Sequence, residues 1–412
     1  MRTFVVLISA LSLSTACAPD DSDPAADAGP PVDAGRPLNA LPAIADLEGE
    51  TWREIEPGGD TICSRGQPWA FFFRPGVSNN LVVEFQGGGA CWNDLTCSVA
   101  DMIFKDNIDD VRNVVLGDPC TQDSDCAGDN GQCLESGRCR RDDPEQGIYD
   151  HSNEKNPFAG WNHLFIPYCT GDIHWGRSVV EYGTGADSFP LNHQGAVNAE
   201  VALRWAKENI PQPETVFIGG CSAGAYGSIG WAPHVMRDYP DSKVIQMGDC
   251  GAGIITDSFL SDSFPIWNAL DTLPAWIDAL DPATIDINTM ELKDLYAEVG
   301  KHYGEHTVSQ YNTVFDNNQV FYYNTMGGQG GEEQWSSKMR DQIYRISQDA
   351  PNFRSYIAPG DEHCIVHRDS FYTVDSNGDG SGTLLVDWIQ EMVDGTTPES
   401  VSCDGCEPAP LP

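Results

Sequence analysis

Residues 215–225 have the sequence TVFIGGCSAGA, and this stretch decides the fold that we expect. Its first part is β-branched, aromatic and aliphatic, which is typical of a buried strand, and residues 225–236 are compatible with a helix. The junction at residues 220–224 has the G-x-S-x-G pattern around Ser222, in the strand–turn–helix context of a nucleophile elbow. The N–H of Ala223 would open the helix and could face an oxyanion. Alone, the pattern fits equally well a tight turn with an idle serine.

The composition of the chain limits its partners. It has 412 residues, of which 40% are hydrophobic, enough for one large catalytic domain with accessory segments. The formal net charge of −39 argues against nucleic acids and anionic membrane surfaces as partners. The same charge disfavours a strongly anionic polymer as substrate, unless the cleft itself is locally neutral.

Residues 1–17 predict a secretory signal peptide. Arg2 precedes an apolar run over residues 4–13, and small residues lead to Cys17. Cys17 resembles the lipidated cysteine of a bacterial lipobox, although Ser14 replaces the leucine that is usual three positions earlier. We therefore expect a secreted or cell-surface protein, lipid-anchored at Cys17 to the bacterial cell envelope, with ordinary signal cleavage as the alternative.

The domain organisation is predicted from local composition. Residues 18–45 are rich in Ala, Pro and Asp and predict a disordered linker. Residues 46–400 would form one catalytic domain and residues 401–412 a Pro-rich tail. Residues 118–147 hold four cysteines and few large apolar side chains, which predicts a disulfide-rich insertion without a core of its own. We expect a monomer.

Fourteen cysteines in an exported chain predict disulfide bonds. Setting Cys17 aside leaves an odd number, so at least one thiol should be unpaired. Cys91 and Cys97 are close enough in sequence to pair, and Cys403 and Cys406 are expected to pair with each other or to be left outside the core. The four cysteines of the insertion allow three pairings, among which the sequence does not choose. A zinc site there is disfavoured, because the spacing is not C-x₂-C and no histidine lies within it.

A glycine-rich loop follows an early strand. Residues 86–92 have the sequence QGGGACW, directly after a strand predicted at residues 81–85. Such a loop can present bare N–H groups to an anion. A phosphate-binding P-loop is excluded, because no Gly-Lys-Ser/Thr follows. A glycine run in this position, far upstream of Ser222, is typical of the oxyanion loop of lipases.

Strands and helices alternate along the rest of the chain. Further strands are predicted at residues 161–168, 243–247, 320–323 and 354–358, and helices at residues 193–210 and 384–393. Residues 262–310 are expected to be helical and interrupted by prolines. This alternation predicts a mostly parallel sheet flanked by helices.

A nucleophilic serine needs a histidine base, which is itself held by a carboxylate. In one common arrangement the acid and then the histidine follow the serine along the chain. His363 lies in a loop just after a predicted strand and is favoured as the base, with His367 as the fallback. Asp249 and Asp316 both lie near strands downstream of Ser222, and the residues alone do not choose between them.

Residues 375–380 match the first half of a calcium-binding loop. Position twelve of that loop would be Val386, where a bidentate glutamate is needed. A polar hairpin turn is therefore favoured over a calcium site between Asp375 and Asp379. We expect no metal and no cofactor.

Five stretches together resemble the pectin acetylesterase family, which includes the Notum-type carboxylesterases. They are residues 87–91, 167–172, 220–224, 315–319 and 362–364, in the family's order. The resemblance implies an α/β-hydrolase fold, with a mostly parallel central sheet flanked by helices. It also implies a triad of Ser222, Asp316 and His363, because the family's acid lies in a D-x-x-Q motif.

The resemblance further implies oxyanion donors at Gly88, Gly89 and Ala223. The chain departs from the family at two points. The family often has a tryptophan after the glycine run, where this chain has Gly89-Ala90, and a further glycine where this chain has Ala225. The disulfide-rich insertion has no assigned counterpart.

The predicted function is a secreted serine esterase that removes acetyl groups from an O-acetylated polysaccharide. One alternative is a carboxylesterase that removes longer acyl chains from lipid or protein. The other is a non-catalytic surface lipoprotein that binds glycans through the same cleft. In each case the expected partner is an acylated carbohydrate or another ester, and not a nucleic acid.

Overall fold

The computed structural model describes residues 36–47, 49–100, 102–117, 119–126, 132–133, 137–139, 146–256, 258–403 and 406. The predicted signal peptide, its Cys17 and residues 18–35 of the predicted linker lie outside these ranges. The described residues belong to one unit, which begins at Arg36. None of the helices in it combines the length and the hydropathy that a membrane span requires.

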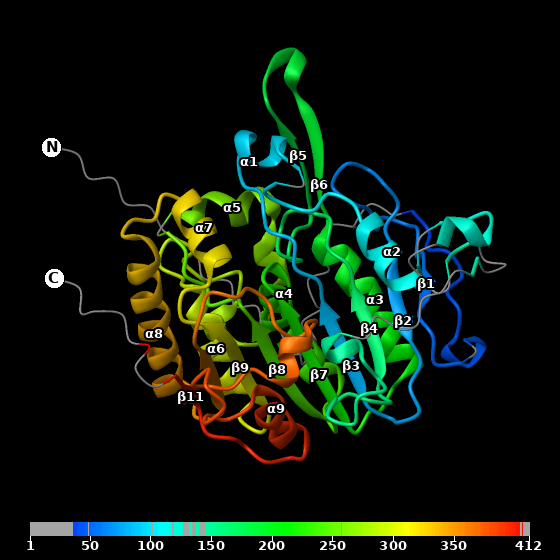
Figure 1. The fold of residues 1–412 in the computed structure, drawn as a ribbon. Coiled ribbons are helices and arrows are strands. Elements are labelled where there is room, and N and C mark those ends of the chain that lie inside the picture. The colour runs from blue at the N-terminus through cyan, green and yellow to red at the C-terminus, as the bar shows by residue number, and fades with distance from the viewer. Residues whose placement is uncertain are drawn as a thin grey trace, which may run out of the picture. The chain divides into compact units, whose positions relative to one another are not determined.

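A nine-stranded sheet runs through the described part of the chain (Figure 1). Its strands, in spatial order, are β1 (Arg53–Ile55), β2 (Phe71–Arg74), β4 (Asn162–Ile166), β3 (Leu81–Phe85), β7 (Thr215–Cys221), β8 (Lys243–Asp249), β9 (Thr307–Thr313), β10 (Phe353–Ala358) and β11 (Val401–Ser402). The pairs β1–β2 and β2–β4 are antiparallel, and every pair from β4 to β11 is parallel. Parallel strands bring their carboxyl ends to one edge, where open α/β sheets bind ligands.

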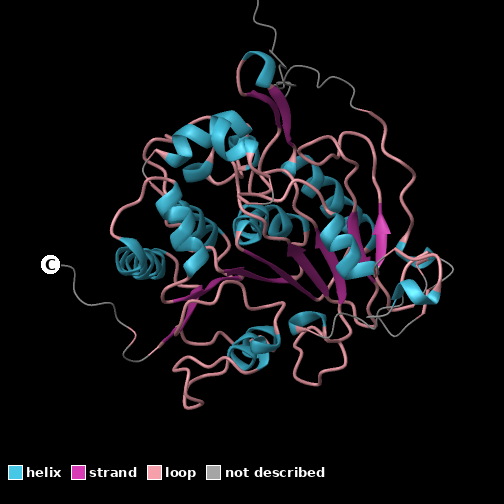
Figure 2. Ribbon diagram, turned by 45° about the horizontal axis from the view of Figure 1, so that its top comes forward, coloured by secondary structure: helices cyan, strands magenta, loops and turns pink. Residues whose placement is uncertain are grey.

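Helices cover both faces of the sheet (Figure 2). One face carries α3 (Gly195–Asn209), α4 (Ala223–Asp238), α6 (Leu292–His302) and α8 (Gly331–Asp349), and the other carries α2 (Asp109–Leu116) and α9 (Leu385–Val393). The period of two along a strand explains this division. Ile218 of β7 belongs to the buried cluster under α3 and α4, whereas Phe217 belongs to the same cluster as Trp388 of α9. The predicted α/β-hydrolase fold is confirmed.

Shorter elements lie beyond the carboxyl ends of the strands. The helices there are α1 (Asp94–Ser98), α5 (Phe259–Trp267) and α7 (Asn317–Thr325). A hairpin of β5 (Ser178–Tyr182) and β6 (Phe189–His193) projects past α1 (Figure 1). Short 3₁₀ helices occur at Ile44–Asp46, Asp123–Cys126, Gly147–Tyr149, Gly185–Asp187, Ala269–Thr272, Asp278–Leu280 and Asp369–Tyr372.

The predicted linker at residues 18–45 is wrong for its last ten residues. The N–H of Asn39 donates to the carbonyl of Pro57 at 2.7 Å, and the indole of Trp205 on α3 donates to the carbonyl of Pro42 at 2.8 Å. A composition poor in aromatic residues suggested disorder there. The segment is instead held because its backbone groups find partners on the domain.

One predicted strand is a helix. Residues 320–323 have β-prone side chains, yet they lie within α7. The carboxylate of Asp316 accepts hydrogen bonds from the N–H groups of Asn318 and Gln319, which caps the start of this helix. The cap and the tertiary packing override the strand propensity. The segment that does form a strand is β9, whose first four residues lie within the region predicted to be helical.

Six disulfides join described cysteines. The pairs are Cys63–Cys169, Cys91–Cys97, Cys120–Cys133, Cys126–Cys139, Cys221–Cys364 and Cys403–Cys406. Two of them, Cys91–Cys97 and Cys403–Cys406, confirm predictions, and the insertion adopts one of its three possible pairings. Cys250 is a buried free thiol, as the odd number of cysteines required.

The calcium-like segment is a polar turn in its geometry. The carboxylate of Asp375 accepts hydrogen bonds from the N–H groups of Asn377, Gly378, Gly380 and Gly382, at 3.0–3.1 Å. Val386 lies in α9 and not in the loop. A carboxylate surrounded by backbone donors is oriented for a turn, which favours that alternative over a cation site.

Candidate active site

Ser222 lies on a sharp turn between β7 and α4. Its backbone has φ 57° and ψ −121°, a strained conformation for a residue with a side chain. A Cβ atom on Gly224 would lie 1.9 Å from the carbonyl oxygen of Phe85, and one on Gly220 would lie 2.4 Å from the same oxygen. The glycines of the G-x-S-x-G pattern are therefore required, because the turn packs directly against the end of β3.

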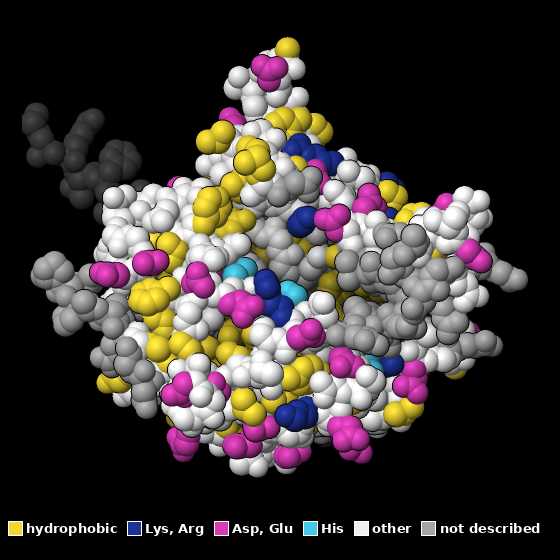
Figure 3. Space-filling view, in the orientation of Figure 1, with side chains coloured by type: hydrophobic (Ala, Val, Ile, Leu, Met, Phe, Trp, Pro, Cys, Tyr) yellow, Lys and Arg dark blue, Asp and Glu magenta, His cyan; other side chains and the backbone are white. Residues whose placement is uncertain are grey.

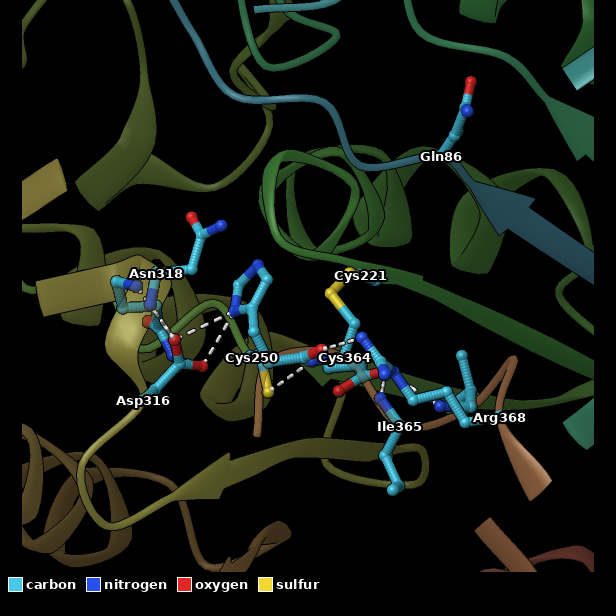
Figure 4. Close-up of a disulfide and its surroundings, with 12 residues drawn as sticks. Gln86, Cys221, Cys250, Asp316, Asn318, Cys364, Ile365 and Arg368 are labelled. Carbon is cyan, nitrogen blue, oxygen red and sulfur yellow. Dashed lines mark hydrogen bonds and ion pairs between the residues drawn. A yellow bond between two sulfur atoms is a disulfide. The ribbon is translucent and has the colours of Figure 1, made fainter. Parts of the chain in front are cut away.

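Asp316 and His363 form a hydrogen-bonded pair (Figure 4). Asp316 follows β9 and His363 follows β10, and Nδ1 of the imidazole lies 2.9 and 2.8 Å from the two carboxylate oxygens. Asp316 is fully buried, and the side-chain amide of Gln319 donates to it at 3.0 Å. Gln319 in turn accepts from the N–H of Ala252 at 2.8 Å. The D-x-x-Q motif thus holds the carboxylate in place for the histidine.

Asp249 has a different task. It ends β8, and its Oδ2 accepts hydrogen bonds from the N–H groups of Ile365 and Val366 at 2.9 and 3.1 Å. These bonds shape the loop that carries His363. Burial raises the pKa of the Asp249 carboxyl, and the two backbone donors oppose that rise. Of the two acids left open by the residues alone, the structure brings Asp316 to the imidazole.

The disulfide Cys221–Cys364 joins the residue before Ser222 to the residue after His363 (Figure 4). The two cysteines are 143 residues apart along the chain. In the chain-entropy model, closing a loop of this length stabilises the folded state by about 5 kcal/mol. The bond fastens the base loop to the serine turn. It was not predicted, and the only available signal was that each cysteine neighbours a triad candidate.

The glycine loop lies against the serine turn. A Cβ atom on Gly87 would lie 2.6 Å from the carbonyl oxygen of Cys221, and Gly89 has φ 74°. Gly88 and Gly89 line a cavity of about 410 Å³ together with Ser222 and His363. Gly89, Ser222 and Ala223 also line a second pocket beside it. Each of the three predicted oxyanion donors therefore lines a cavity that Ser222 also lines.

His174 supports this loop from below and was missed in the sequence. Its Nε2 lies 2.9 Å from the carbonyl oxygen of Gln86, the residue before the glycine run. Burial lowers the pKa of His174 to about 4, so a neutral imidazole donates here from Nε2. Asp172 accepts from the N–H groups of His174 and Gly195, which fixes the backbone around the ring. The resembling stretch at residues 167–172 was the nearest signal.

The comparisons with known proteins bear on this geometry. Residues 116–263 match the family model described as Pectinacetylesterase. This stretch belongs to the pectinacetylesterase family. No curated protein sequence matches the chain. The match includes β7, Ser222 and α4 and ends before Asp316 and His363, so it supports carboxylesterase chemistry on acetylated substrates and does not assign the catalytic residues.

The second pocket beside Ser222 is apolar. Its volume is about 60 Å³, and its apolar side chains include Ile254, Ile255, Phe259, Leu292 and Met326. Ala90, which stands where the family often has a tryptophan, also lines it. The small side chain leaves space in the wall next to Ser222.

Two buried histidines predict that the folded protein is sensitive to acid. Burial lowers the pKa of His174 and of His193 to about 4, so each binds a proton near pH 6.5 only when unfolded. Their contribution to stability is full above pH 6.5 and is lost as the pH falls toward 4. Asp172 has the opposite effect on the pH dependence of stability. Burial raises its pKa to about 6, so its protonation as the pH falls favours the folded protein.

His193→Gln tests this expectation. Between pH 7 and pH 5, the free energy of unfolding should fall by about 1–2 kcal/mol less in the variant than in the wild type, because one buried imidazole no longer titrates. Urea denaturation at the two pH values measures the difference. An identical loss in both proteins would contradict the assignment of His193 as a buried neutral group.

Proposed function

We propose that this protein is a serine esterase in which Ser222 is the nucleophile, His363 the base and Asp316 the orienting acid. The observation that carries the proposal is the Asp316–His363 pair at 2.8–2.9 Å, whose histidine lines the same cavity as Ser222, a serine on a strained turn. The fold supplies all three from the carboxyl ends of β7, β9 and β10. This placement supports acyl transfer to serine, which needs a nucleophile, a base and an orienting acid at one site.

In this mechanism Nε2 of His363 accepts the proton of the Ser222 hydroxyl as its oxygen attacks the ester carbonyl. The N–H groups of Gly88, Gly89 and Ala223 stabilise the oxyanion. The imidazolium then gives its proton to the leaving alcohol, and water hydrolyses the acyl-enzyme by the same steps. Asp316 accepts the hydrogen bond from Nδ1–H, which fixes the tautomer and stabilises the imidazolium.

The cavity above Ser222 supports an anionic substrate. Lys105, His367 and Arg368 line it, and none of its described lining residues is Asp or Glu, in a chain with net charge −39. Basic and histidine side chains gather in the hollow of the face shown in Figure 3. Lys105 forms an ion pair with Asp110, and Arg368 forms one with Glu362. These pairs reduce the positive potential in the cavity without cancelling it. The cleft is thus locally suited to an acetylated acidic polysaccharide.

A longer acyl group is the second candidate, and the apolar pocket favours it. A volume of about 60 Å³ holds about four to six water-sized groups, which exceeds what an acetyl methyl needs. Acyl chains of up to about four carbons would fit without rearrangement. A glycan-binding protein without activity is less well supported, because binding alone does not require the Asp316–His363 pair.

A substrate panel tests the proposed function. We expect acetate release from acetylated polygalacturonate to exceed that from acetylated xylan, and p-nitrophenyl butyrate to be hydrolysed as readily as the acetate. In Arg368→Gln, the ratio of kcat/KM for the acidic polymer to that for p-nitrophenyl acetate should fall about tenfold. Arg204→Gln, outside this cavity on α3, is the matched control.

Two results would overturn this proposal. A preference for octanoyl esters would favour the lipid- or protein-directed esterase. Failure of Ser222 to react with a fluorophosphonate probe would favour the glycan-binding protein.

We also infer that the protein works outside the cytoplasm. Disulfides form and persist in oxidising compartments, and six occur among the described residues. The lipid anchor at Cys17, the cell-envelope location and the monomeric state are further parts of this proposal.

A further inference from the structure

A free thiol lies beside the acid–base pair. Cys250 follows β8, is 1% exposed, and accepts a hydrogen bond at Sγ from the N–H of Cys364 at 3.3 Å. Its Sγ, a carboxylate oxygen of Asp316 and a ring nitrogen of His363 all lie within 4.8 Å of one another. Thiolate, imidazole and carboxylate are the three ligand types that zinc accepts from proteins.

This grouping differs from the others in the described residues. Three further clusters of potential ligands occur, but their cysteines are those of the disulfides Cys91–Cys97, Cys120–Cys133, Cys126–Cys139 and Cys221–Cys364. A disulfide sulfur cannot become a thiolate while the bond is intact. Among these clusters, the one at Cys250 combines a free thiol with an imidazole and a carboxylate.

We propose that Cys250, Asp316 and His363 form an inhibitory site for Zn²⁺ or a similar thiophilic divalent cation. The inhibitory part rests on the proposed esterase function, whereas the binding itself does not. Zinc holds its ligands at about 2.0–2.3 Å, so tetrahedral donors lie about 3.3–3.8 Å apart. Three donors already within 4.8 Å need to move by about 1 Å to reach that arrangement, and a water or the Ser222 hydroxyl would complete it.

The chemistry of binding explains the inhibition. The thiol of Cys250 releases its proton to solvent and becomes a thiolate. At His363 the metal binds Nδ1, the nitrogen that is hydrogen-bonded to Asp316 in the metal-free enzyme. The ring proton moves to Nε2. An imidazole protonated at Nε2 cannot accept the proton of Ser222. One proton is released per metal ion bound, and no oxidant or reductant is needed.

The pocket gives the metal a route to the thiol. Cys250 and Ser222 line the same apolar pocket, so a small cation that reaches the serine also reaches the sulfur.

Cobalt titration of the disulfide-intact protein tests binding directly. Wild-type protein should develop the thiolate-to-Co²⁺ charge-transfer absorption, and Cys250→Ser should not. This wild-type measurement needs no variant. Absence of the absorption in the wild type would overturn the site, whether or not the protein is an active esterase.

Inhibition is measured separately, as the Zn²⁺ concentration that halves each protein's own ester-hydrolysis rate. This concentration should rise at least about tenfold in Cys250→Ser and stay at the wild-type value in His367→Gln, because His367 lies in the cleft outside the three-ligand site. If Cys250→Ser does not fold, Cys250→Ala replaces it. Equal inhibition of wild type and Cys250 variants would refute the role of the thiol.

Discussion

Ser222→Ala is expected to lower kcat for ester hydrolysis by about 10⁴- to 10⁶-fold, the range seen when the nucleophile of a serine hydrolase is removed. The loss is large because no neighbouring hydroxyl can take the position that the turn gives to Ser222. Folding should be preserved, because alanine tolerates the backbone of this turn as well as serine does and the side chain is only partly buried. Hydrolysis of p-nitrophenyl acetate and thermal unfolding measure the two quantities.

Ser228→Ala is the matched control for this result. Ser228 lies on α4, the helix that follows Ser222, and is fully buried. Its hydroxyl donates to the carbonyl of Ala225 and accepts from the side chain of Gln246. Its loss should reduce stability by about 1–3 kcal/mol while changing kcat little. Retention of more than a few per cent of the activity by Ser222→Ala would remove Ser222 from the mechanism.

Asp316→Asn is expected to lower kcat by about 10⁴-fold. An amide nitrogen facing Nδ1 of His363 favours the tautomer in which Nε2 carries the proton, and that tautomer cannot accept a proton from Ser222. The helix cap can persist, because the amide oxygen can take the position of Oδ1, so the variant should fold. Steady-state kinetics on p-nitrophenyl acetate give the rate, and the far-UV circular dichroism spectrum reports the fold.

Asp249→Asn separates the two acids. Asparagine keeps a carbonyl oxygen that can accept from the N–H groups of Ile365 and Val366, so the loop should retain its shape. We expect a loss of less than about tenfold in kcat, because Asp249 acts on the loop and not on the imidazole. If Asp249→Asn proved more damaging than Asp316→Asn, the acid would have been assigned to the wrong strand.

The parts of the site that could be predicted from the sequence are those that depend on short stretches of neighbouring residues. The apolar run before Ser222, the glycines around it and the loop position of His363 each carry a short-range signal, and the structure places them at one edge of the sheet. Asp249 and Asp316 could not be separated from the residues alone. Both follow strands, and only the path of the loop after β10 decides which one meets His363.

Other features depend on contacts that no local pattern encodes. β9 was missed because Ser309, Gln310 and Asn312 are polar yet buried, where Ser309 donates to the carbonyl of Gln246 and the side chain of Asn312 donates to that of Gln310. His174 has no motif of its own, because its role comes from the carbonyl of Gln86 above it. The packing of residues 36–45 likewise depends on partners far along the chain.

The bond between Cys221 and Cys364 has a consequence for the cell that makes this protein. Before the bond closes, the segment with His363 lacks its covalent link to the serine turn, and thiol-rich cytoplasm keeps cysteines reduced. The newly made chain would therefore be a poor esterase while it is still among the acetylated metabolites of its own host. With the export that we propose, closure of this bond would coincide with arrival outside the cytoplasm, where the proposed ester substrates are found.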